Sequence, residues 1–259
     1  MAFVHVLKLI IMNTKYTQDH ENEIKKTISR LENSLMKEGS HGYNDYKGLS
    51  ILDASTKQLE KWTQVRNAAI AVLGVILGAN RNWERAVQPN LEKIKSGPHK
   101  NMTFDALQNL IRTHDYVEFA TIWGHKDAKK YETLSNLVSA ILKLKEKNQK
   151  LSDYELMKNW ADGAKIDKKN TDSIGSIKNI GLATFQHLRL TFGVDTVKPD
   201  QRVMDVLRRE FENIPALSCR LSPGQAITKV EEIAEITHRR VALIDQIFVK
   251  YGSGYYLNN

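Results

Sequence analysis

The chain has very little cysteine and no long apolar run. Its 259 residues contain one cysteine, Cys219, which excludes an intramolecular disulfide and an iron–sulfur cluster held by four closely spaced cysteines. The apolar opening Phe3–Met12 is too short to cross a bilayer, is interrupted by Lys8 and lacks a small-residue cleavage site. We therefore expect no export and no membrane insertion, and a cytoplasmic, nucleoid-associated or nuclear location.

Several catalytic signatures are also missing. The sequence has no Walker phosphate loop, no dinucleotide-binding glycine fingerprint and no serine-hydrolase elbow. Its eight histidines are scattered without the paired spacing of metal ligands. These absences disfavour nucleotide hydrolysis, dinucleotide-dependent redox chemistry and zinc catalysis.

Positive charge is concentrated in the larger, C-terminal part of the chain. Residues 1–60 contain eight Lys or Arg and eight Asp or Glu, whereas residues 61–259 contain thirty against twenty-two, which accounts for the whole net charge of +8. Such an excess attracts polyanions and makes their binding dependent on salt. A nucleic-acid partner is one explanation, and a solvated basic surface is the other.

Apolar residues recur at helical spacing along most of the chain, and strands are hard to find. The sequence therefore predicts an all-α protein with a polar loop at Gly39–Leu52. Helices are predicted at His20–Lys37, Thr56–Asn80 (as one or two helices), Asn82–Lys95, Thr103–Arg112, Tyr116–Ile122, Ala128–Glu146, Asp153–Ala161, Gln201–Asn213, Gly224–Glu235 and Val241–Tyr251.

One segment combines a tight reversal with an acidic residue that follows a proline. Ile180-Gly181 lies between two apolar stripes at helical spacing, one before it with Ile174 and one after it with Phe185. We expect the chain to reverse there, with Gly181 giving the turn its freedom. A helix that opens after such a turn leaves N–H groups unpaired, which suits an anion such as a DNA phosphate. Asp200 follows Pro199 further along.

These residues identify a family resemblance. The run Ile177-Lys178-Asn179-Ile180-Gly181-Leu182-Ala183-Thr184, followed by Phe192-Gly193 and Val197-Lys198-Pro199-Asp200, resembles the helix-hairpin-helix (HhH-GPD) DNA glycosylases, whose endonuclease III-like members excise bases from DNA. Their hairpin has the form L-P-G-V-G-x-K-T-A, and an aspartate follows it. The similarity covers about residues 61–256.

The resemblance implies a two-lobed helical fold with the active cleft between the lobes. Residues 61–193 would form the central lobe, with the hairpin near 177–184. Residues 194–259 would pack with the N-terminal part as the second lobe, and residues 1–60 would be an additional helical extension. The partner implied is double-stranded DNA with a damaged or mismatched base, bound by a monomer.

The resemblance also assigns roles to residues. Asp200 would be the catalytic carboxylate, because cleavage of an N-glycosidic bond builds positive charge on the sugar; it is equally a good N-cap for the next helix. Backbone groups of the hairpin would bind a phosphate, with Lys178 adding charge, and the backbone of Ile177 and Ile180 would hold a monovalent cation. These hairpin residues are Lys178, Asn179, Ile180 and Gly181.

Base flipping needs a side chain that fills the gap in the duplex and a pocket for the base. Asn80 matches the family's wedge position at the end of an apolar helix, although Asn also suits a helix C-terminus. Four aromatic residues could stack on a base, and all four are equally suited to the core: Trp83, Trp123, Trp160 and Tyr131.

Two departures from the family pattern bear on the reaction. Ala183 occupies the position of the lysine that forms a Schiff base in bifunctional members, so a monofunctional glycosylase is expected. Asn179 replaces the first hairpin glycine, and Asn tolerates left-handed backbone. Within the family, absence of the lysine is associated with alkylated or mismatched bases.

Two alternatives remain open at this point. Lys198 lies two residues before Asp200 and would serve a bifunctional glycosylase with AP lyase activity if it replaced the missing lysine. A non-catalytic protein that binds DNA structures through the hairpin is the other alternative, supported by Ala183 and Asn179 and opposed by Asp200.

Overall fold

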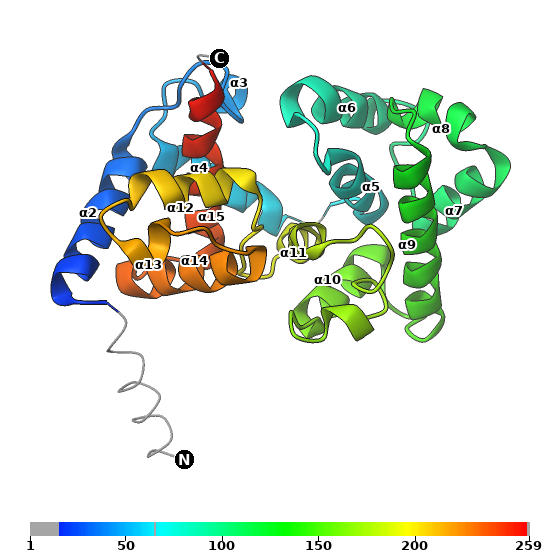
Figure 1. Cartoon of the computed structure of the whole chain (residues 1–259). Helices are drawn as coiled ribbons and strands as arrows, with labels where there is room; N and C mark the ends of the chain where they lie inside the picture. Colours follow the sequence, from blue (N-terminus) through cyan, green and yellow to red (C-terminus); the bar gives the residue numbers. More distant parts are fainter. Residues whose placement is uncertain (1–15, 65, 258–259) are drawn as a thin grey trace.

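The computed structural model describes residues 16–64 and 66–257, whose regular secondary structure is helical (Figure 1). Within these ranges the β-type pairing is limited to one isolated antiparallel bridge between Leu35 and Ser50. The predicted all-α class is confirmed for this part of the chain. No helix in it combines the length and the apolar character needed to span a membrane. The apolar opening Phe3–Met12 lies outside the described residues.

The helices surround two large groups of buried side chains and one small group, which consists of Leu59, Leu190 and Ala242. The central core takes its buried residues from between Ala68 and Phe192, and the terminal core takes them from 24–54 and 197–249. The elements around the central core are α5 (Ala68–Gly78), the π-helix η1 (Trp83–Val87), α6 (Gln88–Ser96), α7 (Phe104–Thr113), α8 (Tyr116–Trp123), α9 (Ala128–Glu146), α10 (Asp153–Gly163) and the 3₁₀ turn η2 (Lys169–Thr171). Helix α11 (Leu182–Thr191) lies between the two halves (Figure 1).

Both ends of the described chain build the terminal core. Ile24 and Leu31 from the first long helix are fully buried with Val203 and Phe248 from the C-terminal part. Residues 16–60 are therefore part of this core. Its elements are α2 (Gln18–Asn33), α3 (Tyr43–Tyr46), α4 (Ile51–Thr63), α12 (Gln201–Glu210), α13 (Pro215–Ser218), α14 (Pro223–Thr237), α15 (Val241–Ser253) and the 3₁₀ turn η3 (Gly254–Tyr256).

Helix α5 lies at the centre of the central core. Nine of its eleven residues are buried, as its apolar sequence AIAVLGVILG requires, because a helix that is apolar on every side must be covered on every side. It contacts α7, α9, α10 and α11. The turn that follows α5 is therefore attached to a rigid element.

Local capping explains where many helices begin. Ser152 and Glu155 form a reciprocal capping box at the start of α10, and Ser222 and Gln225 form another at the start of α14. These side chains satisfy N–H groups that the helix itself leaves unpaired. The predicted range Ala128–Glu146 is confirmed, and the other predicted helices are present with ends shifted by a few residues.

The structure corrects three local predictions. The stripe with Ile174 does not form a helix before the hairpin: after α10 the chain runs through the η2 turn and a series of bends. The predicted loop Gly39–Leu52 contains α3 and ends where α4 begins, at Ile51. The helix predicted from Asn82 starts as the wider turn η1, before Pro89 sets the first turn of α6.

We expect Leu73→Ala in α5 to lower the free energy of unfolding by about 2–5 kcal/mol, because Leu73 is fully buried and the change leaves a cavity. The matched control is Leu35→Ala, since Leu35 is 66% exposed and its loss should cost less than about 0.5 kcal/mol. Urea unfolding of the three proteins measures both values. Equal losses would contradict the packing described for α5.

Candidate functional site

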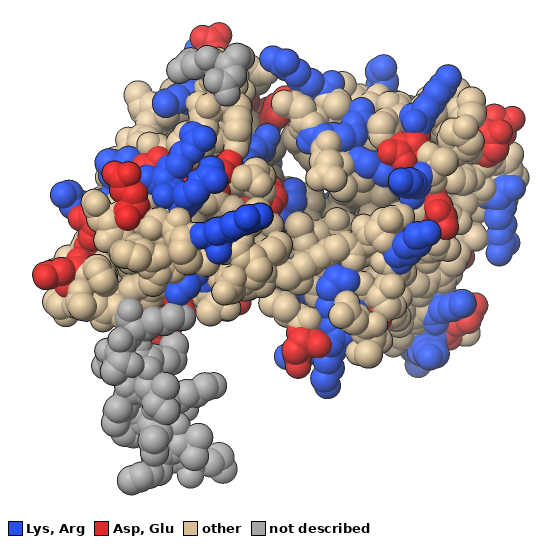
Figure 2. All heavy atoms as spheres, viewed as in Figure 1, with Lys and Arg blue, Asp and Glu red and all other residues tan. Residues whose placement is uncertain are grey.

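A cleft of about 1090 Å³ lies between the two halves and brings together residues that are far apart in sequence. Figure 2 shows the molecule hollowed at this place, with Lys and Arg side chains around the opening. The cleft is lined by six of the residues singled out from the sequence: Asn80, Asn179, Gly181, Ala183, Lys198 and Asp200. Lys178 and Ile180 do not line it.

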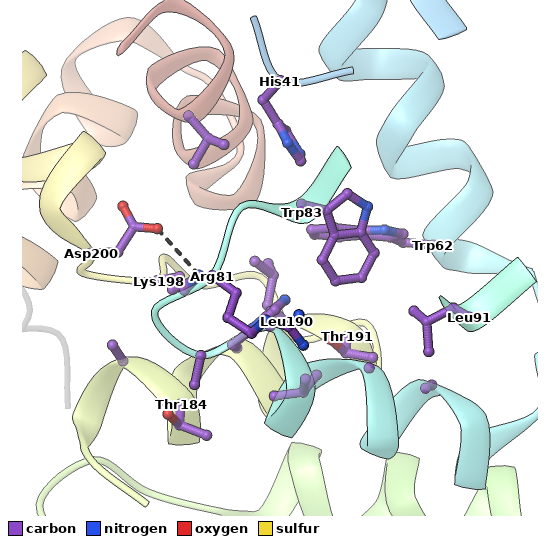
Figure 3. A pocket seen from close by; sticks show the side chains of 18 of the residues that line it. His41, Trp62, Arg81, Trp83, Leu91, Thr184, Leu190, Thr191, Lys198 and Asp200 are labelled. Atoms are coloured by element: carbon purple, nitrogen blue, oxygen red, sulfur yellow. Dashed lines mark ion pairs between the residues drawn. The ribbon is translucent and has the colours of Figure 1, made fainter. Parts of the chain in front are cut away.

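Asp200 is the N-cap of α12, as its sequence context suggested. Its Oδ1 atom accepts hydrogen bonds from the backbone N–H groups of Arg202, at 3.0 Å, and Val203, at 3.3 Å. Its Oδ2 atom lies 3.2 Å from Nζ of Lys198 (Figure 3). One oxygen is thus fixed by the helix, while the other is engaged only with a side chain that can move. The catalytic role of Asp200 stays a prediction.

A second carboxylate, Asp245 of α15, lies behind this pair. It is 1% exposed, and it accepts a hydrogen bond from the backbone N–H of Lys198 at 2.8 Å and another from Nε2 of Gln246 at 2.9 Å. Burial raises the pKa of Asp245 to about 7, and the nearby charge of Asp200 adds to that rise. Asp245 therefore positions the segment that carries Asp200. Sequence reasoning missed it, although an Asp within the apolar pattern of α15 is the signal that could have found it.

The hairpin turns on Asn179 rather than on Gly181. Asn179 has a φ of 70°, in the left-handed region that Asn tolerates, and its side-chain amide donates to Oγ1 of Thr133 in α9 at 3.1 Å. Gly181 has a φ of −75°, which any residue adopts, so the expectation that it frees the turn is wrong. A Cβ on Gly181 would meet open space.

The start of α11 presents backbone donors to the cleft. Gly181 is its N-cap and no side chain caps the helix, so its first N–H groups lack an intrahelical partner. The N–H of Ile180 is used within the turn, where it donates to the carbonyl of Ile177 at 3.0 Å, and the Ile180 side chain is buried. The donors left for an anion are those from Gly181 onward, with exposed Lys178 nearby. A monovalent cation at the backbone of Ile177 and Ile180 stays a prediction.

Asn80 follows the end of α5 and is held in a left-handed conformation, with a φ of 56°. Lys130 of α9 supports this turn, because its Nζ donates to the carbonyls of Leu77, at 3.0 Å, and Ala79. Asn80 is exposed at the edge of the cleft. Its conformation fits the helix-terminating role, and its wedge role stays a prediction.

The structure sorts the four aromatic candidates. Trp123 is fully buried, Trp160 packs edge-to-face on Phe185, and Tyr131 donates to backbone carbonyls at the end of α7. Of the four, Trp83 alone lines the cleft. It is joined there by Trp62 of α4 (Figure 3), which sequence reasoning missed because nothing local marks its side of the helix.

His41 lies at the upper end of the cleft in Figure 3, and it pairs with Glu84. Nδ1 of His41 lies 2.5 Å from Oε1 of Glu84, and the same oxygen accepts the backbone N–H of Gly42 at 2.9 Å. Burial lowers the pKa of His41 below its usual value, against the opposing effect of Glu84. The two atoms are close enough for an ion pair, although Nδ1 makes no hydrogen bond of normal geometry among the described residues.

Positive side chains outnumber negative ones along the cleft. Two carboxylates line it, Asp200 and Asp245, against seven cations: Lys61, Arg66, Arg81, Lys95, Lys100, Lys198 and Arg202. At an effective dielectric constant of about 20, a unit charge about 8 Å away contributes about 2 kcal/mol. The cleft therefore favours an anionic ligand.

Comparison with protein-family models, curated proteins and solved structures found no match to this chain. Within residues 16–64 and 66–257, no three His, Cys, Asp or Glu side chains are placed to hold a metal ion.

The buried carboxyl of Asp245 should make stability depend on pH. Its pKa rises from 3.8 to about 7 in the folded protein, so between these values the unfolded chain is ionised there while the folded protein keeps the proton. Raising the pH from 4 to 7 should therefore destabilise the protein relative to Asp245→Asn, by about 1.4 kcal/mol per unit of pKa difference.

Urea unfolding of both proteins at pH 4, 5.5 and 7 measures this difference. Asp195→Asn is the matched control, because the Asp195 side chain accepts from the first N–H groups of α15 near the surface. Parallel stability curves for wild type and Asp245→Asn would contradict the raised pKa.

Proposed function

We propose that the protein is a monofunctional DNA glycosylase that hydrolyses the N-glycosidic bond of a damaged or mismatched base. One observation carries the proposal: Asp200 and the uncapped N-terminus of α11 line the same basic cleft. A carboxylate beside a phosphate-binding helix end is what this reaction requires, since the DNA backbone has to be held while positive charge develops on one sugar. The HhH-GPD resemblance and its two-lobed fold are part of the proposal.

In the proposed reaction a base turns out of the duplex into the cleft, and Asn80 fills the gap that it leaves. The N–H groups at the start of α11 hold a phosphate next to the extruded nucleotide. Lys198 exchanges its contact with Asp200 for a second phosphate, which frees Oδ2. That oxygen stabilises the oxocarbenium-like sugar and accepts a proton from the attacking water.

A bifunctional glycosylase with lyase activity is the second candidate. The observation that favours it is the 3.2 Å contact between Lys198 and Asp200 inside the cleft, which places an amine beside the proposed catalytic carboxylate. An imine with the abasic sugar would require Lys198 to give up that contact and lose its proton. Hydrolysis also releases Lys198 from Asp200 but leaves the amine protonated, and it is the function we propose first.

Asp200→Asn should lower base release by at least about 100-fold, because the neutral amide can neither stabilise the sugar cation nor accept a proton. Asn caps helices as well as Asp does, so the fold should be retained, and thermal unfolding checks this. Release is measured on duplexes with single lesions or mismatches, as strand breaks after hot alkali. Asp195→Asn, outside the cleft, should behave as wild type.

Breaks that need alkali and depend on Asp200 would support a monofunctional glycosylase. Tight binding to the same duplexes without release of any base would instead favour a non-catalytic DNA-binding protein. Breaks that form without alkali would favour the lyase candidate.

Ala183→Lys should confer borohydride trapping on duplexes from which wild type releases a base. Ala183 is on the first turn of α11, and it lines the same cleft as Asp200. A lysine there would meet the abasic sugar and form an imine that borohydride reduces. Ala183→Met, similar in length but without an amine, is the matched control. Trapping of wild type that Lys198→Met abolishes would contradict the monofunctional assignment.

A further inference from the structure

The deep part of the cleft contains a flat aromatic surface. Trp83 packs against the glycines of α5: a Cβ at Gly78 would lie 3.4 Å from Cζ3 of Trp83, and one at Gly74 would lie 2.9 Å from Leu91. The indole thus lies in ordinary contact distance of α5, and Gly74 leaves room for the Leu91 side chain. Trp62 reaches the same cleft from the other half (Figure 3). Aromatic faces of this kind stack on any base, so they do not select between bases.

Selection has to come from the polar groups around that surface. His41 lines the cleft with its Nδ1 2.5 Å from Oε1 of Glu84, and none of the described residues hydrogen-bonds its Nε2. Arg66, which precedes α5, and Arg81, which follows it, both line the cleft. Each has one guanidinium nitrogen that is buried and has no hydrogen-bond partner among the described residues. Burial lowers the pKa of both arginines, as expected of cations without a counter-ion.

These two arginines differ from the other cations of the cleft. Lys61, Lys95 and Lys100 are exposed, which suits contacts with DNA phosphates, and Lys198 already faces Asp200. Arg66, Arg81 and Arg202 are partly buried, and no ion pair links any of them to a carboxylate among the described residues. Of these three, Arg66 and Arg81 have a buried guanidinium nitrogen without a partner. Once phosphates occupy the exposed lysines, positive charge remains at the inner wall.

We propose that the cleft selects an uncharged base, such as a deaminated or oxidised one, over a base that carries a positive charge, such as an N-alkylated purine. This inference rests on the proposed glycosylase function and names its substrate class. It departs from the family association with alkylated bases.

The change in charge on the base during the reaction is the physical reason for this selection. The C1′–N bond breaks with its electron pair going to the base nitrogen, the oxygen of water bonds to C1′, and a proton of that water passes to Asp200 and then to the released base. An uncharged base gains negative charge in this step, which Arg66 and Arg81 stabilise. An N-alkylated purine starts as a cation and leaves neutral. Its charge changes by the same amount in this step, so the arginines favour bond breaking in both cases, but they repel the cationic base when it binds. The selection therefore lies in the rate from free enzyme and free duplex.

The test compares rate enhancements, because alkylated purines are lost faster without any enzyme. Single-turnover release is measured with full-length protein, at concentrations well below saturation, on duplexes containing uracil, hypoxanthine, 8-oxoguanine or 7-methylguanine. Each second-order rate constant is divided by the spontaneous rate of the same duplex. We expect the enhancement for at least one uncharged base to exceed that for 7-methylguanine by about 100-fold or more. An equal or larger enhancement for 7-methylguanine would overturn the inference and leave the glycosylase function standing. Release from none of the duplexes would overturn both.

Two variants separate a contact with the base from a contact with phosphate. Arg66→Gln and Arg81→Gln should each slow release of the uncharged base by about 10–100-fold, without weakening affinity for a duplex that holds a tetrahydrofuran abasic analogue at the same position. Arg112→Gln, on the exposed side of α7 away from the cleft, is the matched control. If affinity for the abasic duplex falls as much as the rate does, the arginines bind phosphate and the inference is wrong.

Discussion

The buried amide of Gln186 is the contact on which the arrangement of the site depends. Gln186 is fully buried in α11; its Nε2 donates to Oγ1 of Thr196 and to the carbonyl of Val197, and its Oε1 accepts from Arg189. The same helix begins at the hairpin, and the same segment leads to Asp200. A buried amide left without partners is costly, so these bonds fix the start of α11 relative to the carboxylate. Hydrophobic packing alone would allow the two to slide.

Charge is distributed unevenly around α11 and the segment that leads to Asp200. Asp245 is buried at a cost that its raised pKa reflects, and it holds the backbone of Lys198 in return. Arg66 and Arg81 keep unpartnered donors at the cleft. A protein selected for stability alone would pair or remove such groups, so their retention is consistent with a ligand that completes them. Our proposals assign this ligand to DNA and to the base that leaves it.

The N-terminal residues matter to the site through packing and through one side chain. Ile24 and Leu31 complete the terminal core that carries α12 and α15, and His41 lines the cleft itself. From the sequence these residues are an extension of open role. The structure makes residues 16–60 part of the wall of the cleft and of the core behind it.

Local features of the protein could be predicted from the sequence because they depend on neighbouring residues. Helix periodicity placed most elements, capping chemistry marked Asp200, and the tolerance of Asn for left-handed backbone anticipated Asn179. The error at Gly181 has the same local origin: Asn179 takes the strained position, so the glycine does not need it. The sequence did not indicate that one cleft is lined by four further residues: Asp245, Trp62, Arg66 and His41. These residues come from helices and loops separated by up to 200 positions, and their burial, pKa and neighbours exist only once the two cores have packed against α11.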